Sequence, residues 1–201
     1  MPRQIRTKVL SDGAYAHVYS RSLDKRFIFS DDEDFHIFRR LLLKTKTHGH
    51  YRVHHYCIMS THFHMVVTID NLTGFSRDLK YLKQTYANQY HEKYKKPGTV
   101  WWGRFGSQLI ENEKYLYACG LYVEMNPVKA GMVSKAEDWP HSSNRHYFLG
   151  KEDELVDQYK RSSYDVAVEL TEGLNIGHGS YIGTPLFLLN RGALRPDPMG
   201  V

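Results

Sequence analysis

Two histidines separated by one residue are the first side chains of this chain whose spacing suits chemistry. His62 and His64 lie in the segment Tyr56–Ile69, whose apolar and polar residues alternate with the period of two that is typical of a β-strand. Successive side chains of a strand point to opposite faces, so both imidazoles stand on one face and can bind one metal ion together. The alternative is a half-buried strand whose histidines only meet solvent, and the pair by itself does not decide between the two.

Tyr122 and Asn126 form a second pair, because residues four apart on a helix lie one above the other on the same side. The sequence predicts a helix over about 113–125, and we expect this helix to cover the histidine face of the sheet. Asn126 would then add an amide oxygen to the imidazoles of His62 and His64, a set of three protein ligands with open positions. Mg²⁺ or Mn²⁺ in such a site polarises a phosphate oxygen and offsets the charge that develops in the transition state.

Tyr122 is the residue of this helix that we expect to act as a nucleophile and to form a covalent phosphotyrosine. A phenol has a reference pKa of roughly 10, so its deprotonation needs a metal ion or a neighbouring base. The chain contains 15 tyrosines, and Tyr115 and Tyr117 lie on the same predicted helix. On the sequence alone, both stay alternatives to Tyr122.

Short strands and two long helices must position these residues. The spacing of apolar residues and the turn residues predict a strand over residues 13–22, a helix over about 30–47, a strand over about 51–69, a helix over about 75–94, a strand over 106–110 and the helix over about 113–125. Pro127 ends the last helix. Short strands beside two long helices favour an α+β layer, with both helices on one face of the sheet.

Composition changes near residue 150. We expect a catalytic domain over residues 1–150 and an acidic, then Gly- and Pro-rich, extension over residues 151–201, with a helix near 152–172 and a loosely ordered end. Residues 1–150 carry 22 Lys/Arg and 14 Asp/Glu, a balance of +8, and residues 151–201 carry 5 and 8, a balance of −3, which gives the net charge of +5. A basic body indicates a polyanionic partner such as nucleic acid.

The remaining composition bears on the compartment. The apolar runs of the 201-residue chain are too short to cross a bilayer, and we expect no membrane association. Two cysteines, Cys57 and Cys119, cannot build a disulfide framework, so we expect both to be reduced and buried in a cytoplasmic protein.

Aromatic and basic residues are interleaved between the second long helix and the strand that follows it, in the string V-W-W-G-R-F at 100–105. Such a mixture suits unstacked bases and a phosphate backbone. The alternative is that the two tryptophans cover the edge of a small core. The residues expected to contact DNA are Arg3, Arg6, Lys95, Lys96, Trp101, Trp102 and Arg104. The histidines expected on the surface include His48, His50, His54 and His55.

Four strings of residues resemble one family of DNA enzymes, in the order of that family's motifs. T-H-F-H-M-V-V at 61–67 is similar to the His-hydrophobic-His strand of the single-tyrosine transposases, the HUH superfamily. Y-V-E-M-N-P-V-K-A-G-M-V at 122–133 resembles the tyrosine helix of their REP-associated tyrosine transposase branch. W-P-H-S-S at 139–143 matches the Trp-x-x-Ser-Ser that follows there, and W-W-G-R-F at 101–105 resembles the branch's Trp-x-x-x-Phe/Tyr stretch. The resemblance covers roughly residues 10–148.

The resemblance implies a ferredoxin-like antiparallel sheet with two long helices on one face and the tyrosine-bearing helix covering the other. It also implies metal-dependent cleavage of single-stranded DNA near hairpins, with a 5′-phosphotyrosine and a free 3′-hydroxyl as intermediate. Carried over residue by residue, His62 and His64 are metal ligands, Tyr122 is the nucleophile and Asn126 is the amide ligand. Relatives include dimers that exchange the tyrosine helix and proteins that act alone, so the chain is expected to be a monomer or a homodimer.

Two other functions stay open. A domesticated relative would bind hairpin DNA without catalysis, and its binding would survive both EDTA and Tyr122→Phe. A small relaxase or replication-initiator nickase is the other enzyme considered, although the Tyr-x-x-x-Asn-Pro spacing and the small size disfavour it. The chain has no G-x-x-x-x-G-K-[ST] phosphate loop, which agrees with a reaction that keeps a phosphodiester bond and needs no nucleotide cofactor.

Overall fold

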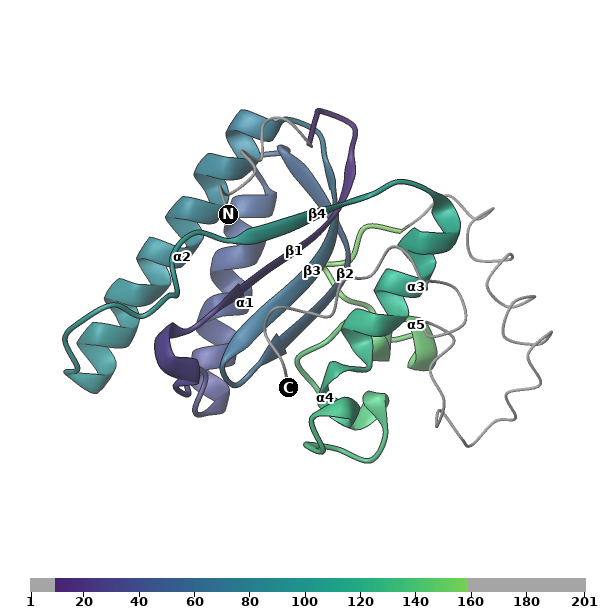
Figure 1. Cartoon of the computed structure of the whole chain (residues 1–201). Helices are drawn as coiled ribbons and strands as arrows, with labels where there is room; N and C mark the ends of the chain where they lie inside the picture. Colours follow the sequence, from purple (N-terminus) through teal and green to yellow (C-terminus); the bar gives the residue numbers. More distant parts are fainter. Residues whose placement is uncertain (1–9, 159–201) are drawn as a thin grey trace.

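Apolar residues spaced two apart in the strands and three or four apart in the helices give a sheet with helices on both faces (Figure 1). The computed structural model describes residues 10–158. The strands are β1 (Tyr15–Arg21), β2 (Tyr51–Met59), β3 (His62–Ile69) and β4 (Gly106–Ile110), and the helices are α1 (Asp32–Lys46), α2 (Leu72–Tyr94), α3 (Glu113–Glu124), α4 (Asn126–Lys129) and α5 (Asn144–Leu149), with single 3₁₀ turns at Leu23–Lys25 and Ala136–Asp138.

The four strands lie in the order β2-β3-β1-β4, and every neighbouring pair is antiparallel. With the chain order β1-α1-β2-β3-α2-β4, this is the ferredoxin-like arrangement. The long helices α1 and α2 cover one face, and α3 lies on the other side of the sheet (Figure 1). The predicted fold class, α+β with the tyrosine-bearing helix opposite the two long helices, is confirmed.

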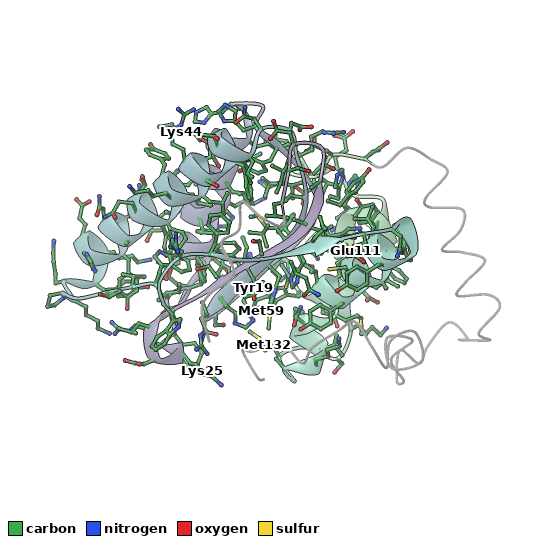
Figure 2. The ribbon with its side chains drawn as sticks, turned by 45° about the horizontal axis from the view of Figure 1, so that its top comes forward. Tyr19, Lys25, Lys44, Met59, Glu111 and Met132 are labelled. Carbon is green, nitrogen blue, oxygen red and sulfur yellow. The ribbon has the colours of Figure 1, made fainter. Side chains whose placement is uncertain are left out.

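Two clusters of buried apolar side chains fill the space on the two sides of the sheet (Figure 2). In the larger cluster, under α1 and α2, the rings of Phe38 and Phe63 lie 5.0 Å apart between centroids. The smaller cluster, under α3, contains Val66, Leu116 and Val123. Both cysteines are buried in this smaller cluster without a disulfide, as expected.

The two long helices begin at capped positions and are joined at one end. Asp31 and Asp34 form a capping box at the start of α1, and the Asn71 side chain accepts from the amide of Gly74 at the start of α2. Lys93, in the last turn of α2, makes ion pairs with Asp31 at 2.7 Å and Asp34 at 3.0 Å. This lysine therefore holds the end of α2 against the start of α1.

The predicted single strand over about 51–69 is wrong, because the chain turns after Met59 and forms a hairpin of β2 and β3. The turn reverses the alternation of faces. Cys57 and Met59 pair with His64 and His62 and therefore lie on the histidine face. An unbroken strand would have placed these odd-numbered residues on the opposite face, under α1 and α2. Within β3 the alternation holds, so the two histidines share a face as predicted.

The segment that follows α5 continues along the edge of β2 instead of forming the start of the helix predicted near 152–172. Leu155 is fully buried in the larger core. The amide of Asp157 donates to the carbonyl of Val53 at 2.6 Å, and the Asp157 carboxylate accepts from the Val53 amide at 2.8 Å. The rest of that predicted helix and the loosely ordered end lie outside the described residues, and the boundary at residue 150 stays a prediction.

Candidate active site

His64 lies at the centre of the sheet face that α3 covers. It is 1% exposed, and Tyr19 of β1 is its direct neighbour across the sheet. The Nε2 atom of His17 lies 3.0 Å from Nδ1 of His64, and the two rings stack with centroids 5.1 Å apart. Burial holds the pKa of His64 well below its ordinary value, and the nearby basic groups His17, His62 and Lys129 act in the same direction. His64 is therefore a neutral imidazole near pH 7.

A neutral imidazole carries one N–H and one lone pair. The Nε2 atom of His64 is buried and has no hydrogen-bond partner within residues 10–158. When His64 donates through Nδ1 to His17, its lone pair falls on Nε2, which is then free to bind a metal ion. A buried nitrogen of this kind becomes satisfied once a cation binds it, so the surroundings of His64 fit the divalent metal that the sequence predicts.

His62 shares this face, one pleat along β3. Its ring centroid is 5.0 Å from that of His64, and the two rings are perpendicular. Its Nδ1 atom lies 2.8 Å from the hydroxyl of Thr61, so a hydrogen bond through Nδ1 orients this ring as it does the ring of His64. The predicted pairing of the two imidazoles on one face is confirmed, while their role as ligands stays a prediction.

Tyr122 of α3 lies against the two stacked imidazoles. Its ring centroid is 6.1 Å from that of His17 and 6.2 Å from that of His64, and the contacts are edge-to-face. The ammonium of Lys129 lies 4.1 Å from the centroid of the Tyr122 ring, and burial lowers the pKa of this lysine. A cation beside a phenol favours the phenolate, so the position of Lys129 fits the predicted role of Tyr122, which stays a prediction.

Tyr115 has different surroundings on the same helix. Its hydroxyl accepts from the side-chain amide of Gln108 at 3.0 Å, and burial raises its pKa to about 12. A phenol that is harder to ionise and whose oxygen is held by β4 is a poorer nucleophile. The geometry therefore favours Tyr122 over Tyr115.

Asn126 is the first residue of α4, separated from the end of α3 by Met125, and is 4% exposed. Its amide nitrogen donates to the carbonyl of Tyr122 at 3.0 Å and to that of Val123 at 3.1 Å. Only the NH₂ group can satisfy two carbonyls, so these bonds fix the orientation of the amide and keep Oδ1 as its acceptor atom. Oδ1 is the atom that the predicted ligand role requires, and this role also stays a prediction.

A buried acid–base network holds α3 against the sheet. The Glu124 carboxylate, 2% exposed, accepts from His55 Nδ1 at 2.7 Å, from the Ser143 hydroxyl at 2.7 Å and from the Asn144 amide at 3.2 Å. Gly120 allows the helix to approach closely, because a Cβ there would lie 2.4 Å from the His55 ring. The glutamate of Y-V-E-M-N-P and the second serine of W-P-H-S-S thus meet in space, and together they fix the helix that carries Tyr122.

The W-P-H-S-S segment is itself bound along β2. The Trp139 indole donates to the carbonyl of Ile58 at 3.0 Å, and the Ile58 amide donates to the carbonyl of His141 at 2.9 Å. The Ser143 amide donates to the carbonyl of Tyr56 at 3.0 Å. The chain after α4 therefore returns to the sheet and pairs with its edge strand.

The residues predicted to contact DNA differ from one another in their exposure to solvent. Trp101 is 6% exposed and its indole donates to the carbonyl of Lys83 at 2.9 Å, so its ring belongs to the core and is not accessible to a base in this conformation. The alternative, that the segment closes the edge of the core, holds for Trp101. Trp102 is 48% exposed, with the Arg21 guanidinium 5.2 Å from its ring. Lys95, Lys96 and Arg104 are exposed, whereas Arg3 and Arg6 lie outside the described residues.

The expectation that His54 and His55 are surface residues is wrong, since they are 2% and 4% exposed. His54 bridges the Thr68 hydroxyl at 2.7 Å and the Asp157 carbonyl at 2.8 Å, and burial lowers its pKa to about 4. A bulge shifts the β2–β3 register between Val53 and His55, and both histidines point into the protein.

His17 and Lys129 were not singled out in the sequence, although both contact Tyr122. The available signal for His17 was its position on the predicted first strand, but only the pairing of β1 with β3 places it on the histidine face. Lys129 lies beyond the proline that ends the predicted helix, in the separate turn of α4.

The fold and this site together define the class of the single-tyrosine transposases: a ferredoxin-like sheet, two imidazoles on one face and a tyrosine on the helix that covers them. The family description "Transposase IS200 like" matches residues 11–126. The chain therefore belongs to the IS200-like transposase family, and the resemblance found in its motifs is confirmed.

The chain is also similar to individual members of this class. It is 30% identical over 117 residues to a "Putative REP-associated tyrosine transposase" of Haemophilus influenzae, covering 53% of this chain and 66% of that protein. It is 24% identical over 110 residues to a REP-associated tyrosine transposase of Escherichia coli, covering 54% and 64%. The matches thus span just under two thirds of each relative.

A solved structure of a REP-associated tyrosine transposase bound to a REP hairpin has the same fold, with a TM-score of 0.59 and 20% sequence identity. The superposition covers 79% of this chain and 93% of the other. Within residues 10–158, no helix has the length and apolar character needed to cross a membrane.

Proposed function

We propose that the protein nicks and rejoins single-stranded DNA near hairpins through a covalent 5′-phosphotyrosine at Tyr122. The observation that carries the proposal is the contact of the Tyr122 ring with His64, whose buried Nε2 is available to a metal ion. Membership of the transposase family supports DNA strand transfer as the activity, and the hairpin-bound structural neighbour supports hairpin DNA as the partner. The catalytic unit would be residues 1–150, acting in the cytoplasm where DNA is available.

His62, His64 and Asn126 would hold Mg²⁺ or Mn²⁺. Imidazole nitrogens and an amide oxygen suit Mn²⁺, and the open positions would accept phosphate oxygens. The ion, when bound, supplies positive charge that polarises the phosphate to be attacked. The Nδ1 bonds of the two histidines, to Thr61 and His17, keep both rings in one orientation for this role.

In the cleavage step, Tyr122 loses its phenolic proton and its oxygen attacks the phosphorus of the phosphodiester. The bond from phosphorus to the tyrosine oxygen forms as the bond to the 3′ oxygen breaks, and the leaving oxygen takes up a proton. One phosphodiester replaces another, so the free 3′-hydroxyl reverses the step without a further energy source. Lys129 stabilises the phenolate, and the network around Glu124 holds the helix in place.

The test is a denaturing gel of the protein with end-labelled single-stranded hairpin DNA and Mn²⁺. We expect a slow-migrating covalent band in the wild-type protein and in Tyr115→Phe, and no band in Tyr122→Phe or with EDTA. A covalent band that survives Tyr122→Phe would show that another residue is the nucleophile.

The same samples separate the other functions. Hairpin binding that resists both EDTA and Tyr122→Phe, with no adduct in the wild type, would indicate a non-catalytic hairpin-binding protein. In a parallel reaction with an unstructured single strand, an adduct that forms there and not on the hairpin would indicate a relaxase or replication-initiator nickase.

A further inference from the structure

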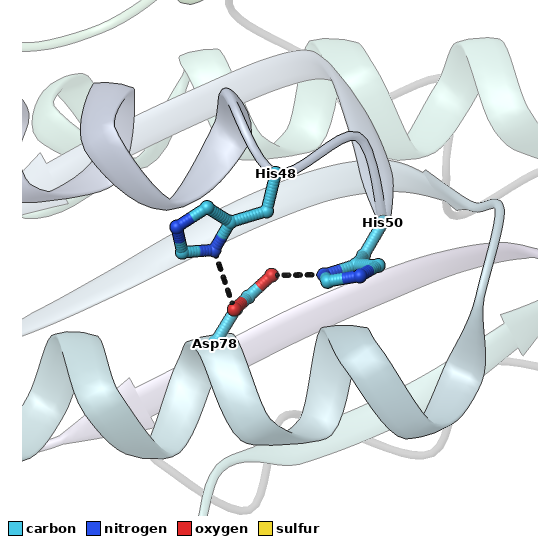
Figure 3. Close-up of side chains that lie close together, drawn as sticks. All are labelled: His48, His50 and Asp78. Atoms are coloured by element: carbon cyan, nitrogen blue, oxygen red, sulfur yellow. Dashed lines mark hydrogen bonds and ion pairs between the residues drawn. The ribbon is translucent and has the colours of Figure 1, made fainter.

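A second cluster of side chains that can bind a metal ion lies beside α2, on the side of the sheet opposite α3 (Figure 3). His48 and His50 lie in the turn between α1 and β2, and Asp78 lies in the second turn of α2. Nitrogen and carboxylate atoms of the three residues lie within 4.8 Å of one another. Tyr51, which follows His50, and Cys57, the partner of His64, are six residues apart along β2. At about 3.3 Å per residue, roughly 20 Å separate this cluster from His64.

The Asp78 carboxylate is the centre of the cluster. Its side chain is 3% exposed, and each oxygen contacts a different imidazole: Oδ1 lies 2.8 Å from His48 Nδ1 and Oδ2 lies 2.7 Å from His50 Nδ1. A buried carboxylate is costly unless it is partnered. Two imidazoles that converge on one carboxylate through the same type of ring nitrogen provide three ligand atoms around a single point.

The surroundings hold these side chains in place and leave a route from solvent. The carbonyl of His50 accepts the amides of Asp70 at 2.9 Å and Asn71 at 3.0 Å, which fixes the backbone of this histidine. Gly74 lets the His50 ring lie against the first turn of α2, because a Cβ there would lie 2.4 Å from the ring. The side chain of His48 is 42% exposed, so an ion can reach the cluster from that side.

We propose that His48, His50 and Asp78 form a second metal site, which takes Zn²⁺ or an ion of similar preference, such as Co²⁺, with water as the fourth ligand. Two imidazoles and one carboxylate are a ligand set that Zn²⁺ uses. Around a tetrahedral ion with ligand distances of about 2.0–2.1 Å, the ligand atoms lie about 3.3 Å apart. One carboxylate oxygen of Asp78 would be the ligand, and its distance to the imidazole nitrogen that it now contacts, 2.7 or 2.8 Å, would open by about half an ångström. The ligand atom of the second imidazole lies within 4.8 Å of the others.

Binding also changes the position of two protons. Without the ion, each imidazole donates through Nδ1 to Asp78. To bind the ion, Nδ1 needs a lone pair, so its proton moves through water to Nε2 and the ring stays neutral. The ion would replace the two hydrogen bonds and join the α1–β2 turn to α2. Because the ligands come from these two elements and lie far from Tyr122, the site is structural.

The experiment titrates Co²⁺ into tag-free protein carrying His62→Ala and His64→Ala, so that the candidate active site cannot bind the ion. Bound metal is counted by elemental analysis, and its geometry is read from the visible absorption of Co²⁺. We expect one equivalent with the strong absorption of a tetrahedral site, and a rise in the melting temperature of several degrees that EDTA reverses.

Adding His48→Ala should abolish this equivalent and the melting shift, whereas adding His36→Ala, at an exposed histidine of α1, should leave both unchanged. His48 is exposed, so its replacement is expected to preserve the fold, which circular dichroism checks. No bound Co²⁺ in the double variant, or an equivalent that persists in His48→Ala, would overturn the proposal and leave a hydrogen-bonded cluster only. If the double variant fails to fold, wild type and His48→Ala are compared directly: the loss of one equivalent supports the site and equal stoichiometry overturns it.

Discussion

At the scale of single residues, the candidate active site depends on which nitrogen of His64 carries the proton. The ring is neutral and buried, its Nδ1 faces His17 at 3.0 Å, and its Nε2 has no protein partner within residues 10–158. His17 therefore holds the ring in place, and when its Nε2 accepts from Nδ1 of His64 the lone pair of His64 falls on Nε2, where a metal ion can bind. Tyr122 is packed against both rings, so the orientation of His17 also bears on the nucleophile.

Replacing His17 by phenylalanine keeps the stacked ring and removes its nitrogen atoms. Without the bond to Nδ1, the His64 ring loses the group that fixes its tautomer, and we expect the affinity for Mn²⁺ to fall by about 10- to 100-fold. The measurement is a Mn²⁺ titration followed by electron paramagnetic resonance. His36→Phe, at an exposed position, is the control, and an unchanged affinity in His17→Phe would contradict the positioning role.

Replacing Lys129 by methionine removes the cation 4.1 Å from the Tyr122 ring while keeping most of the side-chain volume. The phenolate then loses a nearby positive charge. We expect covalent adduct to form about tenfold more slowly near pH 7, equivalent to about 1.4 kcal/mol in the activation free energy. Single-turnover kinetics on hairpin DNA give the rate. Lys135→Met, at an exposed lysine that follows α4, should react at the wild-type rate, and equal rates in both variants would exclude the role of Lys129.

At the scale of elements, the position of Tyr122 depends on how α3 is docked. This helix contributes Glu124 to a buried network with His55 of β2 and Ser143, and the W-P-H-S-S segment closes the network by pairing with β2. The helix also contacts β4 through the hydrogen bond between Tyr115 and Gln108, and the smaller apolar cluster lies beneath it. We expect the network to contribute strongly to where the phenol lies relative to the histidines.

Glu124→Ala should destabilise the protein by about 2–6 kcal/mol, because it leaves a buried imidazole and a buried hydroxyl without their acceptor, at about 1–3 kcal/mol for each group. Urea unfolding followed by circular dichroism gives the free energy of unfolding. Glu111→Ala is the matched control, at an exposed glutamate before α3 that is labelled in Figure 2, and it should change stability by less than about 0.5 kcal/mol. Similar stabilities for the two variants would show that the network does not hold α3.

At the scale of the whole molecule, two groups of histidines lie in different parts of the fold. The candidate active site occupies the face under α3, and the cluster of His48, His50 and Asp78 lies between the α1–β2 turn and α2 (Figure 3). Burial lowers the pKa of two further histidines, His54 and His141, so the stability of the fold is coupled to pH. His54 is the clearest of these, since it joins β3 to the segment after α5.

Burial lowers the pKa of His54 from 6.5 to about 4. Below pH 6.5 the unfolded chain binds a proton that the folded chain does not, so the stability contributed by neutral His54 is complete above pH 6.5 and is lost as the pH falls toward 4. The loss is about 1.4 kcal/mol per pH unit. His141, whose pKa burial also lowers to about 4, adds to it.

Urea unfolding at pH values between 7.5 and 4.5 measures this dependence. We expect the free energy of unfolding to fall steeply below pH 6.5 in the wild type and less steeply in His54→Gln, whose side chain does not titrate. The variant should be less stable than the wild type at pH 7.5, where the neutral ring contributes fully. An identical slope in both proteins would show that His54 does not carry the effect.

Local periodicity explains why much of the fold could be predicted. The alternation in β1 and β3 and the three- and four-residue spacing in the long helices depend on neighbouring residues alone. The hairpin after Met59 was missed because its turn holds serine and threonine, without the glycine, proline or asparagine that marks most turns. The bulge before His55 was missed for a similar reason, since it interrupts the alternation without a residue that signals it.

The sequence by itself determined the shared face of His62 and His64 and the helix that carries Tyr122, because each follows from spacing within one element. It also indicated the class of the protein, through the resemblance of four ordered motifs to a known family. Only the tertiary structure decided which side chains meet across elements: His17 with His64, and Asp78 with the two histidines of the α1–β2 turn. These contacts depend on strand register and on how helices pack on the sheet. Residues far apart in the chain are brought together by these long-range pairings, which no local pattern encodes.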